Sequence, residues 1–558
     1  MVIVSTLYSK FILYKKNIDC YNEHIKKGVI MKKLTFTLIT ILLLIAVIFV
    51  PVTANAADIS MTQVSADTNY VIPEESDLPE SYSSLELGYC TEVKTQTQNA
   101  CWIYSTVSSI ESCFLRNNIF SEILDFSETH LDIWGSKRED GQGWQREPFD
   151  PGYTDIPIGY LTSWNGPVYE DNSETNFRVN SLVYLTKNDM NKTKELIMKN
   201  GAVTANFNTH SFAYSKDRCS YCLTDPISEI SGHTISVVGW DDNYSKENFN
   251  GNYMPKNNGA WLCKNSWGNN NDIGGYLWIS YEDYYLFSND FFGYSFGIDG
   301  YQFINENDYL YQNEEYGATY EFGYIDSDVI TYYNVFDFSE NGNRLDKVIF
   351  ETTSKGADYK VYYVPVDELG KPVDDVTKRI DLYEGTVDYR GYICCDFDDV
   401  TLSQDKGAIA VEIDTASVNQ NLAIDEIPVK NSIGVSEWLR NRESGKIIFQ
   451  QQGEYGKSFV NYNGEITDVM DFYNNEFNDP IGGMLVIKAL TNKKVNTKTL
   501  GDVNLDENVD INDATMIQKY INNSFTNLMN DQLINADFNK DSVININDVT
   551  SIQKYISK

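Results

Sequence analysis

Residues 96–105 read QTQNACWIYS, and this stretch decides the fold of the first half of the chain. Behind Cys101, apolar residues recur at positions 103, 107, 110 and 114, the spacing of one buried helix face. The pattern predicts a helix that begins at or next to Cys101. Because a helix N-terminus favours an anion, we expect the pKa of the Cys101 thiol to be lowered. A lone cysteine is more often an inert buried thiol, so the rest of the chain must decide between the two.

The composition limits the classes of function. The chain has 558 residues, too long for one core, and predicts about three domains. Its net charge of −36 argues against a nucleic-acid partner, because phosphate binding needs a basic face. The cysteines are odd in number and form no disulfide framework. Cys219-x-x-Cys222 predicts an ordinary loop, with a bridge as the alternative.

The N-terminal segment has the features of a secretory signal. Met31-Lys32-Lys33 is followed by an apolar run over 41–50 and by Ala54-Asn55-Ala56, a small-x-small cleavage site. The run is short for a membrane span, which favours cleavage over a retained anchor, and no later segment is apolar enough to cross a bilayer. We therefore predict an upstream extension ahead of the true start (1–30), a signal peptide (31–56) and a short pro-segment or linker (57–78).

Three of the four histidines follow Cys101 in the chain. His130 lies in the sequence FSETHL, which predicts a helix start, and His210 lies in a polar stretch. His233 follows a glycine and opens an alternating segment over 234–240, the pattern of a strand.

Two further strands are predicted downstream of the His233 strand. Residues 260–264 read AWLCK and end at Asn265, and residues 276–281 follow a turn at Gly274-Gly275. Cys101, His233 and Asn265 thus occur in this order along the chain.

This order resembles the papain-like cysteine peptidases. The resemblance covers 79–298 and implies an α+β domain with a helical half and an antiparallel β half. The residues that carry it are Cys101-Trp102, Gly232-His233, Asn265-Ser266-Trp267-Gly268, Val93-Lys94-x-Gln96, Ser127-Glu128-x-x-Leu131 and Gly274-Gly275-Tyr276.

The resemblance implies a role for each residue. Cys101 is the nucleophile, which needs a base to become a thiolate. His233 is the general base and acid, and Asn265 orients its ring through a neutral amide oxygen. Trp267 shields that hydrogen bond from water. The implied activity is that of a cysteine endopeptidase, and the chemistry needs no cofactor.

A glutamine is expected to stabilise the tetrahedral oxyanion. Gln96 and Gln98 are the candidates, and we assign Gln96 because residues 93–96 match the upstream pattern in register. Gln96 lies one residue closer to Cys101 than the glutamine of the family. Residues 99–104 read NACWIY where the family has GSCWAF, which keeps an alternative open: a catalytically impaired component that binds protein or glycan.

Residues 299–492 change in character. Short alternating segments separated by turns, for example 329–333 and 408–413, predict an antiparallel β-sandwich. The segments 334–336, 457–460 and 482–489 resemble the lectin-like domain that follows the peptidase in some bacterial papain-like proteins. Because that name describes a shape, we expect a substrate-positioning or accessory role, with carbohydrate binding as the second reading.

A polar linker over 493–499 leads to an internal repeat over 500–558. The segments 502–513 and 537–548 both place oxygen side chains at positions 1, 3, 5, 9 and 12, the pattern of a calcium loop. Each is followed by a predicted helix containing IQKYI, over 514–521 and 549–556. The predicted ligands of two calcium ions are Asp502, Asn504, Asp506, Asn508 (backbone carbonyl), Asp510, Asp513, Asp537, Asn539, Asp541, Val543 (backbone carbonyl), Asn545 and Asp548.

The repeat resembles a type I-like dockerin, a small all-α module that binds cohesin domains of cellulosome-type scaffolds. At position 6, Glu507 and Ser542 replace the usual glycine, which costs about 1–2 kcal/mol in a left-handed conformation and predicts weakened calcium binding. The whole chain is thus expected to be a secreted, extracellular peptidase attached to a cell-surface or free complex, acting on a protein or peptide substrate.

Overall fold

The structure is a computed structural model. It describes residues 78–119, 124–288, 293–305, 307–324, 327–339, 344–402, 404–418, 431–440, 447–477, 481–492, 500–504, 508–522, 528, 530–540 and 543–557. The predicted upstream extension, signal peptide and linker, and residues 57–77 of the pro-segment, lie outside the described residues and stay predictions.

The N-terminal domain (residues 78–303) pairs a group of helices with an antiparallel sheet. Its helices and strands are β1 (Ser81–Ser83), α2 (Cys101–Arg116), α3 (Glu128–Trp134), β2 (Gly143–Trp144), α4 (Asp155–Thr162), β3 (Phe177–Leu185), α5 (Met190–Asn200), β4 (Val203–Asn208), β5 (Tyr214–Ser215), β6 (Ser220–Tyr221), β7 (Gly232–Asp241), β8 (Ala260–Lys264), β9 (Tyr276–Ser280) and β10 (Ser295–Phe303).

Helix α2 forms where the sequence predicts it. It begins at Cys101, and its predicted apolar face is buried. Hydroxyl groups hold its other side against the sheet: Ser236 Oγ donates to the carbonyl of Ser105 at 2.8 Å, and Ser109 Oγ lies 3.1 Å from Thr204 Oγ1. These bonds fix the start of α2 against strands β4 and β7.

Strand β7 is central to the β half. It pairs antiparallel with β4 and β8, in a register that joins Ser236 to Lys264. Since the strands run in opposite directions, the beginning of β7 and the end of β8 lie at the same edge of the sheet. His233 and Asn265, which occupy these two positions, are thereby brought together. Cys219 and Cys222 are free thiols, so the alternative bridge is not formed, and the two residues between them form strand β6 in place of the predicted loop.

The β-sandwich domain (residues 307–492) follows. Its elements are β11 (Asp308–Tyr311), β12 (Tyr320–Phe322), β13 (Val329–Asp337), β14 (Arg344–Thr352), β15 (Asp358–Pro365), β16 (Ile380–Thr386), β17 (Gly391–Thr401), β18 (Lys406–Asp414), β19 (Ile433–Glu437), β20 (Leu439–Arg440), β21 (Ile447–Gln450), β22 (Ser458–Tyr462), β23 (Glu465–Asp468), α6 (Val469–Phe477), β24 (Gly483–Leu485) and β25 (Ile487–Asn492).

The sandwich buries its core between two layers. A six-stranded sheet, in the order β16-β15-β18-β13-β22-β23, packs against β14, β17 and β25. Tyr332 and Val411 of the first layer share one buried apolar cluster with Phe350 and Ile487 of the second. The predicted antiparallel β-sandwich is confirmed.

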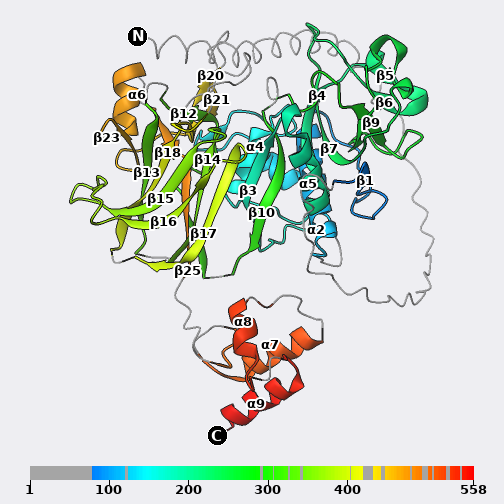
Figure 1. Cartoon of the computed structure of the whole chain (residues 1–558). Coiled ribbons are helices and arrows are strands. Elements are labelled where there is room, and N and C mark those ends of the chain that lie inside the picture. The colour runs from blue at the N-terminus through cyan, green and yellow to red at the C-terminus, as the bar shows by residue number, and fades with distance from the viewer. Residues whose placement is uncertain are drawn as a thin grey trace, which may run out of the picture.

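One sheet runs through both domains. Strand β17 pairs with β3, joining Tyr392 to Leu182, and Tyr184 N donates to the carbonyl of Arg390 at 2.8 Å. A 13-stranded sheet results, and Figure 1 shows the yellow strands of the β-sandwich domain continuing into the cyan and green strands of the N-terminal domain. The sequence predicts two separate modules, and the continuity of the sheet between them was not predicted.

The C-terminal domain (residues 500–557) contains α7 (Ile511–Ile521), α8 (Asn530–Ala536) and α9 (Ile546–Ile556). Helices α7 and α9 begin three residues earlier than the predicted starts at 514 and 549, because Asp510 and Asn545 cap them and Asp513 and Asp548 close capping boxes. Ile517 and Ile552, equivalent positions in the two repeats, are buried in one shared core.

Candidate active site

Cys101 is the first residue of α2 and is partly buried. Its thiol accepts hydrogen bonds from Thr234, the residue after His233 on β7, and from backbone N–H groups at the start of α2. Burial nevertheless raises the pKa of the thiol, and these hydrogen bonds offset the shift only in part. The expected lowering of this pKa is therefore not found, because desolvation outweighs the helix terminus.

His233, near the start of β7, is only 4% exposed. Its Nε2 lies 2.8 Å from Asn265 Oδ1, and its ring stacks on Trp267 with centroids 4.5 Å apart. Burial lowers the pKa of His233 to about 4, against the opposing effect of the Asn265 hydrogen bond. The imidazole is thus neutral at neutral pH and can accept a proton.

Asn265 is held in one orientation from several sides. Its backbone N–H donates to the carbonyl of Gly275 at 3.2 Å, and its Oδ1 also accepts the backbone N–H of Ser266 at 2.8 Å. Because Oδ1 receives two donors, the amide presents its oxygen to His233. Trp267 is 49% exposed and covers the His233 ring from the solvent side.

Gln96 lies against the segment that follows Asn265. Its backbone N–H donates to the carbonyl of Ser266 at 2.6 Å, and its Oε1 accepts the Ser266 hydroxyl at 2.6 Å. Its Nε2 donates to the carbonyl of Gln98 at 2.9 Å, and Gln98 has a left-handed φ of 48°. Gln96 is therefore tied to the strand end that carries Asn265, and Gln98 shapes the loop before Cys101.

A charged network lies beside these residues. Lys94 Nζ contacts carboxylate oxygens of Glu111 at 3.3 Å, Asp125 at 2.6 Å and Glu128 at 2.8 Å. Lys94, Glu111 and Glu128 line a small cavity of about 10 Å³ that also reaches Thr234 and Asn265, enough for about one water molecule. The network anchors the segment that leads to Gln96.

The other described histidines are held elsewhere. His130 Nδ1 lies 2.8 Å from the Tyr160 hydroxyl, and His210 Nε2 lies 3.1 Å from Asn208 Oδ1. His24 lies outside the described residues. His233 is the histidine that meets Asn265. Thr234 was missed by the sequence analysis, although its place directly after His233 was a usable signal.

In the C-terminal domain, the first repeat folds around Asp513, which is fully buried. Asp513 Oδ1 accepts the N–H groups of Val503 at 2.6 Å and Asn504 at 2.9 Å, and its Oδ2 accepts that of Asp510 at 2.8 Å. Asp502, the first residue of this loop, is also fully buried. The described predicted ligands are Asp502, Asn504, Asn508, Asp510 and Asp513, while Asp506 lies outside the described residues.

The second repeat has the same arrangement. Asp548 is fully buried and accepts the N–H groups of Asn539 at 3.1 Å and Asn545 at 2.9 Å. A buried carboxylate together with further carboxylate and amide oxygens around the same loop is a set of donors that fits a hard cation such as calcium. The described predicted ligands are Asp537, Asn539, Val543, Asn545 and Asp548, while Asp541, Glu507 and Ser542 lie outside the described residues.

No helix within the described part of the chain is long and apolar enough to span a membrane. Three family models match separate parts of the sequence. The model described as papain family cysteine protease matches residues 73–291, the lectin-like domain matches 310–438, and the dockerin type I domain matches 500–557.

Two similar solved structures come from one clostridial protein. The clostridial cysteine protease Cwp84 after propeptide cleavage is 32% identical, with a TM-score of 0.64, over 74% of this chain and 99% of that chain. The cysteine protease and lectin-like domains of Cwp84, a surface layer associated protein of Clostridium difficile, are 31% identical, with a TM-score of 0.63, over 75% of this chain and 89% of that chain. The chain belongs to the papain family of cysteine proteases, and it carries a lectin-like domain and a type I dockerin domain.

Proposed function

We propose that this cysteine protease cleaves peptide bonds with Cys101 as nucleophile, His233 as general base and acid, and Asn265 as the residue that orients His233. The observation that carries the proposal is the 2.8 Å contact between His233 Nε2 and Asn265 Oδ1 under the Trp267 ring. That contact leaves Nδ1 of the imidazole as the atom that exchanges protons with Cys101.

The reaction proceeds in two halves. Cys101 Sγ attacks the scissile carbonyl carbon while His233 takes the thiol proton, which forms a tetrahedral oxyanion. As the C–N bond breaks, His233 gives that proton to the leaving amine, and a thioester remains on Cys101. Water then attacks the thioester, with His233 taking one of its protons and returning a proton to the thiol as the acid product leaves.

The oxyanion needs donors that are already in place. Gln96 is our candidate, because its side chain is oriented through Ser266 beside Asn265. The amide nitrogen carries two protons, of which one is directed to the Gln98 carbonyl. The other is available for an oxyanion on a carbonyl bound to Cys101.

The test compares the full chain with its Cys101→Ala variant on fluorescein-labelled casein. We expect hydrolysis by the wild type, none by Cys101→Ala, and a loss of about 100-fold or more in Gln96→Ala, the usual effect of removing one oxyanion donor. Equal hydrolysis by wild type and Cys101→Ala would refute the assignment of the nucleophile.

We further propose that the protease is secreted and binds a cohesin domain of an extracellular cellulosome-type scaffold through residues 500–558. Type I dockerins bind calcium, and the two loops offer one site each. There the ion would compensate the buried carboxylates and stabilise the starts of α7 and α9. Titration of the chelator-treated chain with calcium should give two ions per chain, and a stoichiometry below one would contradict the assignment of the loops.

The β-sandwich domain has two candidate roles. Substrate positioning is favoured by its shared sheet with the N-terminal domain. Carbohydrate binding is the second candidate and rests on the lectin-like shape alone, so glycan-array binding by the Cys101→Ala chain is its direct test.

A further inference from the structure

A largely buried arginine connects Trp102, the residue that follows Cys101, to a surface loop. The Arg146 guanidinium lies over the ring of Trp102, 5.0 Å from its centroid, and Trp102 directly follows Cys101. Arg146 Nη2 pairs with Asp132 Oδ1 at 2.7 Å, with both side chains nearly buried, and also donates to the carbonyl of Asp150 at 2.6 Å. One side chain therefore fixes both Trp102 and the loop of residues 147–152.

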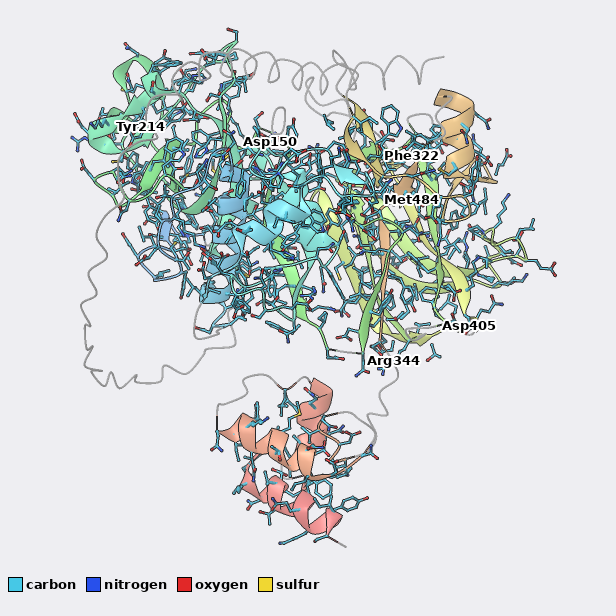
Figure 2. The ribbon with its side chains drawn as sticks, turned by 180° about the vertical axis from the view of Figure 1, so that it is seen from behind. Asp150, Tyr214, Phe322, Arg344, Asp405 and Met484 are labelled. Carbon is cyan, nitrogen blue, oxygen red and sulfur yellow. The ribbon has the colours of Figure 1, made fainter. Side chains whose placement is uncertain are left out.

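That loop passes over the ring of Trp102, the residue that follows Cys101, in a fixed shape. A Cβ on Gly152 would overlap the Trp102 ring, so the backbone at this position passes directly over the indole. Phe149 has a left-handed φ of 67°, and its N–H donates to Asp132 Oδ2 at 2.9 Å. In Figure 2, Asp150 lies in the upper half of the molecule, between Tyr214 of β5 and Phe322 of the β-sandwich domain in this view.

The arginine is in turn held by the β-sandwich domain. Strand β2 (Gly143–Trp144) ends just before Arg146 and pairs with β21 (Ile447–Gln450) of that domain. Gln145 N continues the ladder by donating to the carbonyl of Ile448 at 2.8 Å. Trp144 packs on Phe449 with ring centroids 4.9 Å apart.

Tyr316 of the β-sandwich domain supports the same strand from beneath. Its ring contacts Trp134 and Phe449, with centroids 5.5 Å and 5.4 Å away, and its hydroxyl accepts a hydrogen bond from Arg138. A Cβ on Gly143 would lie 2.8 Å from the Tyr316 ring, so β2 rests directly on this side chain.

We propose that the β-sandwich domain is part of the substrate-binding site: Tyr316 and β21 position β2 and Arg146, and thereby the loop 147–152 that contacts the substrate beside Cys101. Tyr316 is a positioning residue, since it touches neither Cys101 nor His233. The inference rests on the proposed function and assigns the accessory role to a specific contact. A misplaced binding loop weakens substrate binding before it disturbs the thiol, because Cys101 is held separately by α2 and β7.

The test uses Tyr316→Ala in the full chain. We expect kcat/KM for labelled casein to fall about tenfold, mainly through KM, since displacements near 1 Å are costly in bound geometry. The rate of Cys101 alkylation by iodoacetamide, which needs no binding loop, should stay within about twofold of wild type, and Tyr316→Phe should retain most of the activity. The matched control is Tyr359→Ala, because Tyr359 packs within the β-sandwich domain on Phe350 and Tyr383.

Two outcomes overturn the inference: a loss in Tyr316→Ala no larger than in Tyr359→Ala, or alkylation of Cys101 that falls in parallel with kcat/KM. If Tyr316→Ala does not fold, Gly143→Ala is the test variant in its place, because the added methyl group would push β2 away from the Tyr316 ring. Hydrogen exchange of residues 137–153 gives an independent readout and should be faster in the variant, whereas unchanged exchange contradicts the coupling. A wild type that cleaves nothing refutes the proposed function, and the exchange measurement still tests the contact.

Discussion

Replacing Asn265 with alanine probes the proposed catalytic pair through one hydrogen bond. His233 is 4% exposed, and its Nε2 meets Asn265 Oδ1 at 2.8 Å. The substitution leaves a buried ring N–H without a partner, which costs about 1–3 kcal/mol. At the middle of that range, about 2 kcal/mol, kcat/KM falls about 30-fold if the cost falls on the transition state, where the ring is charged.

The same substitution shifts the pH dependence in a defined direction. The Asn265 hydrogen bond raises the pKa of His233 against the effect of burial, so its loss lowers that pKa further below about 4. The acid limb of kcat/KM should therefore move to lower pH, while the plateau falls.

The assay is casein hydrolysis followed from acid to neutral pH in Asn265→Ala and in Asn258→Ala. Asn258 is an exposed asparagine on the loop before β8, and its replacement should leave kcat/KM unchanged. A plateau in Asn265→Ala within twofold of wild type, or an acid limb that moves upward, would refute the reasoning.

Three further predictions concern calcium, pH and the buried core. Calcium removal with EGTA should abolish cohesin binding and lower the helix content of the C-terminal domain, while casein hydrolysis is retained. Simultaneous loss of hydrolysis would contradict the prediction that the dockerin and the peptidase act independently. The acid limb of wild-type kcat/KM should lie near pH 4, because the buried His233 stays neutral above its pKa of about 4, whereas a limb near the ordinary 6.5 would count against its burial. Burial raises the pKa of the Glu351 carboxyl above 4.5, so the stability contributed by its protonated form is lost as pH rises through the folded pKa. Glu351→Gln should therefore have a Tm at pH 8 at least as high as that of the wild type. A lower Tm in the variant would contradict this prediction.

Local patterns predicted the elements of the candidate site. The helical spacing behind Cys101, the alternation after His233 and the strand that ends at Asn265 each describe a buried face, and each forms as expected. In the dockerin repeat, Asp510 and Asn545, which cap α7 and α9, were predicted as calcium ligands. Their capping bonds explain why both helices begin three residues earlier than predicted.

What the sequence did not reveal depends on contacts between distant segments. The pairing of β17 with β3 consists of backbone hydrogen bonds, which leave no side-chain pattern in either strand. Arg146 reads as a surface charge in sequence, and only the fold places it between Trp102 and Asp132. The raised pKa of Cys101 has the same origin, since desolvation depends on everything packed around the thiol.

The most direct test of the central claim is the rate of alkylation at Cys101, measured by mass spectrometry at neutral pH in the wild type and in His233→Ala. Since burial raises the pKa of the thiol, Cys101 should react slowly unless His233 takes its proton. The account predicts that Cys101 is labelled faster than the other cysteines in the wild type, and that this advantage is lost in His233→Ala. Slow labelling of Cys101 in both proteins, or fast labelling that survives the loss of His233, would contradict the proposed catalytic pair.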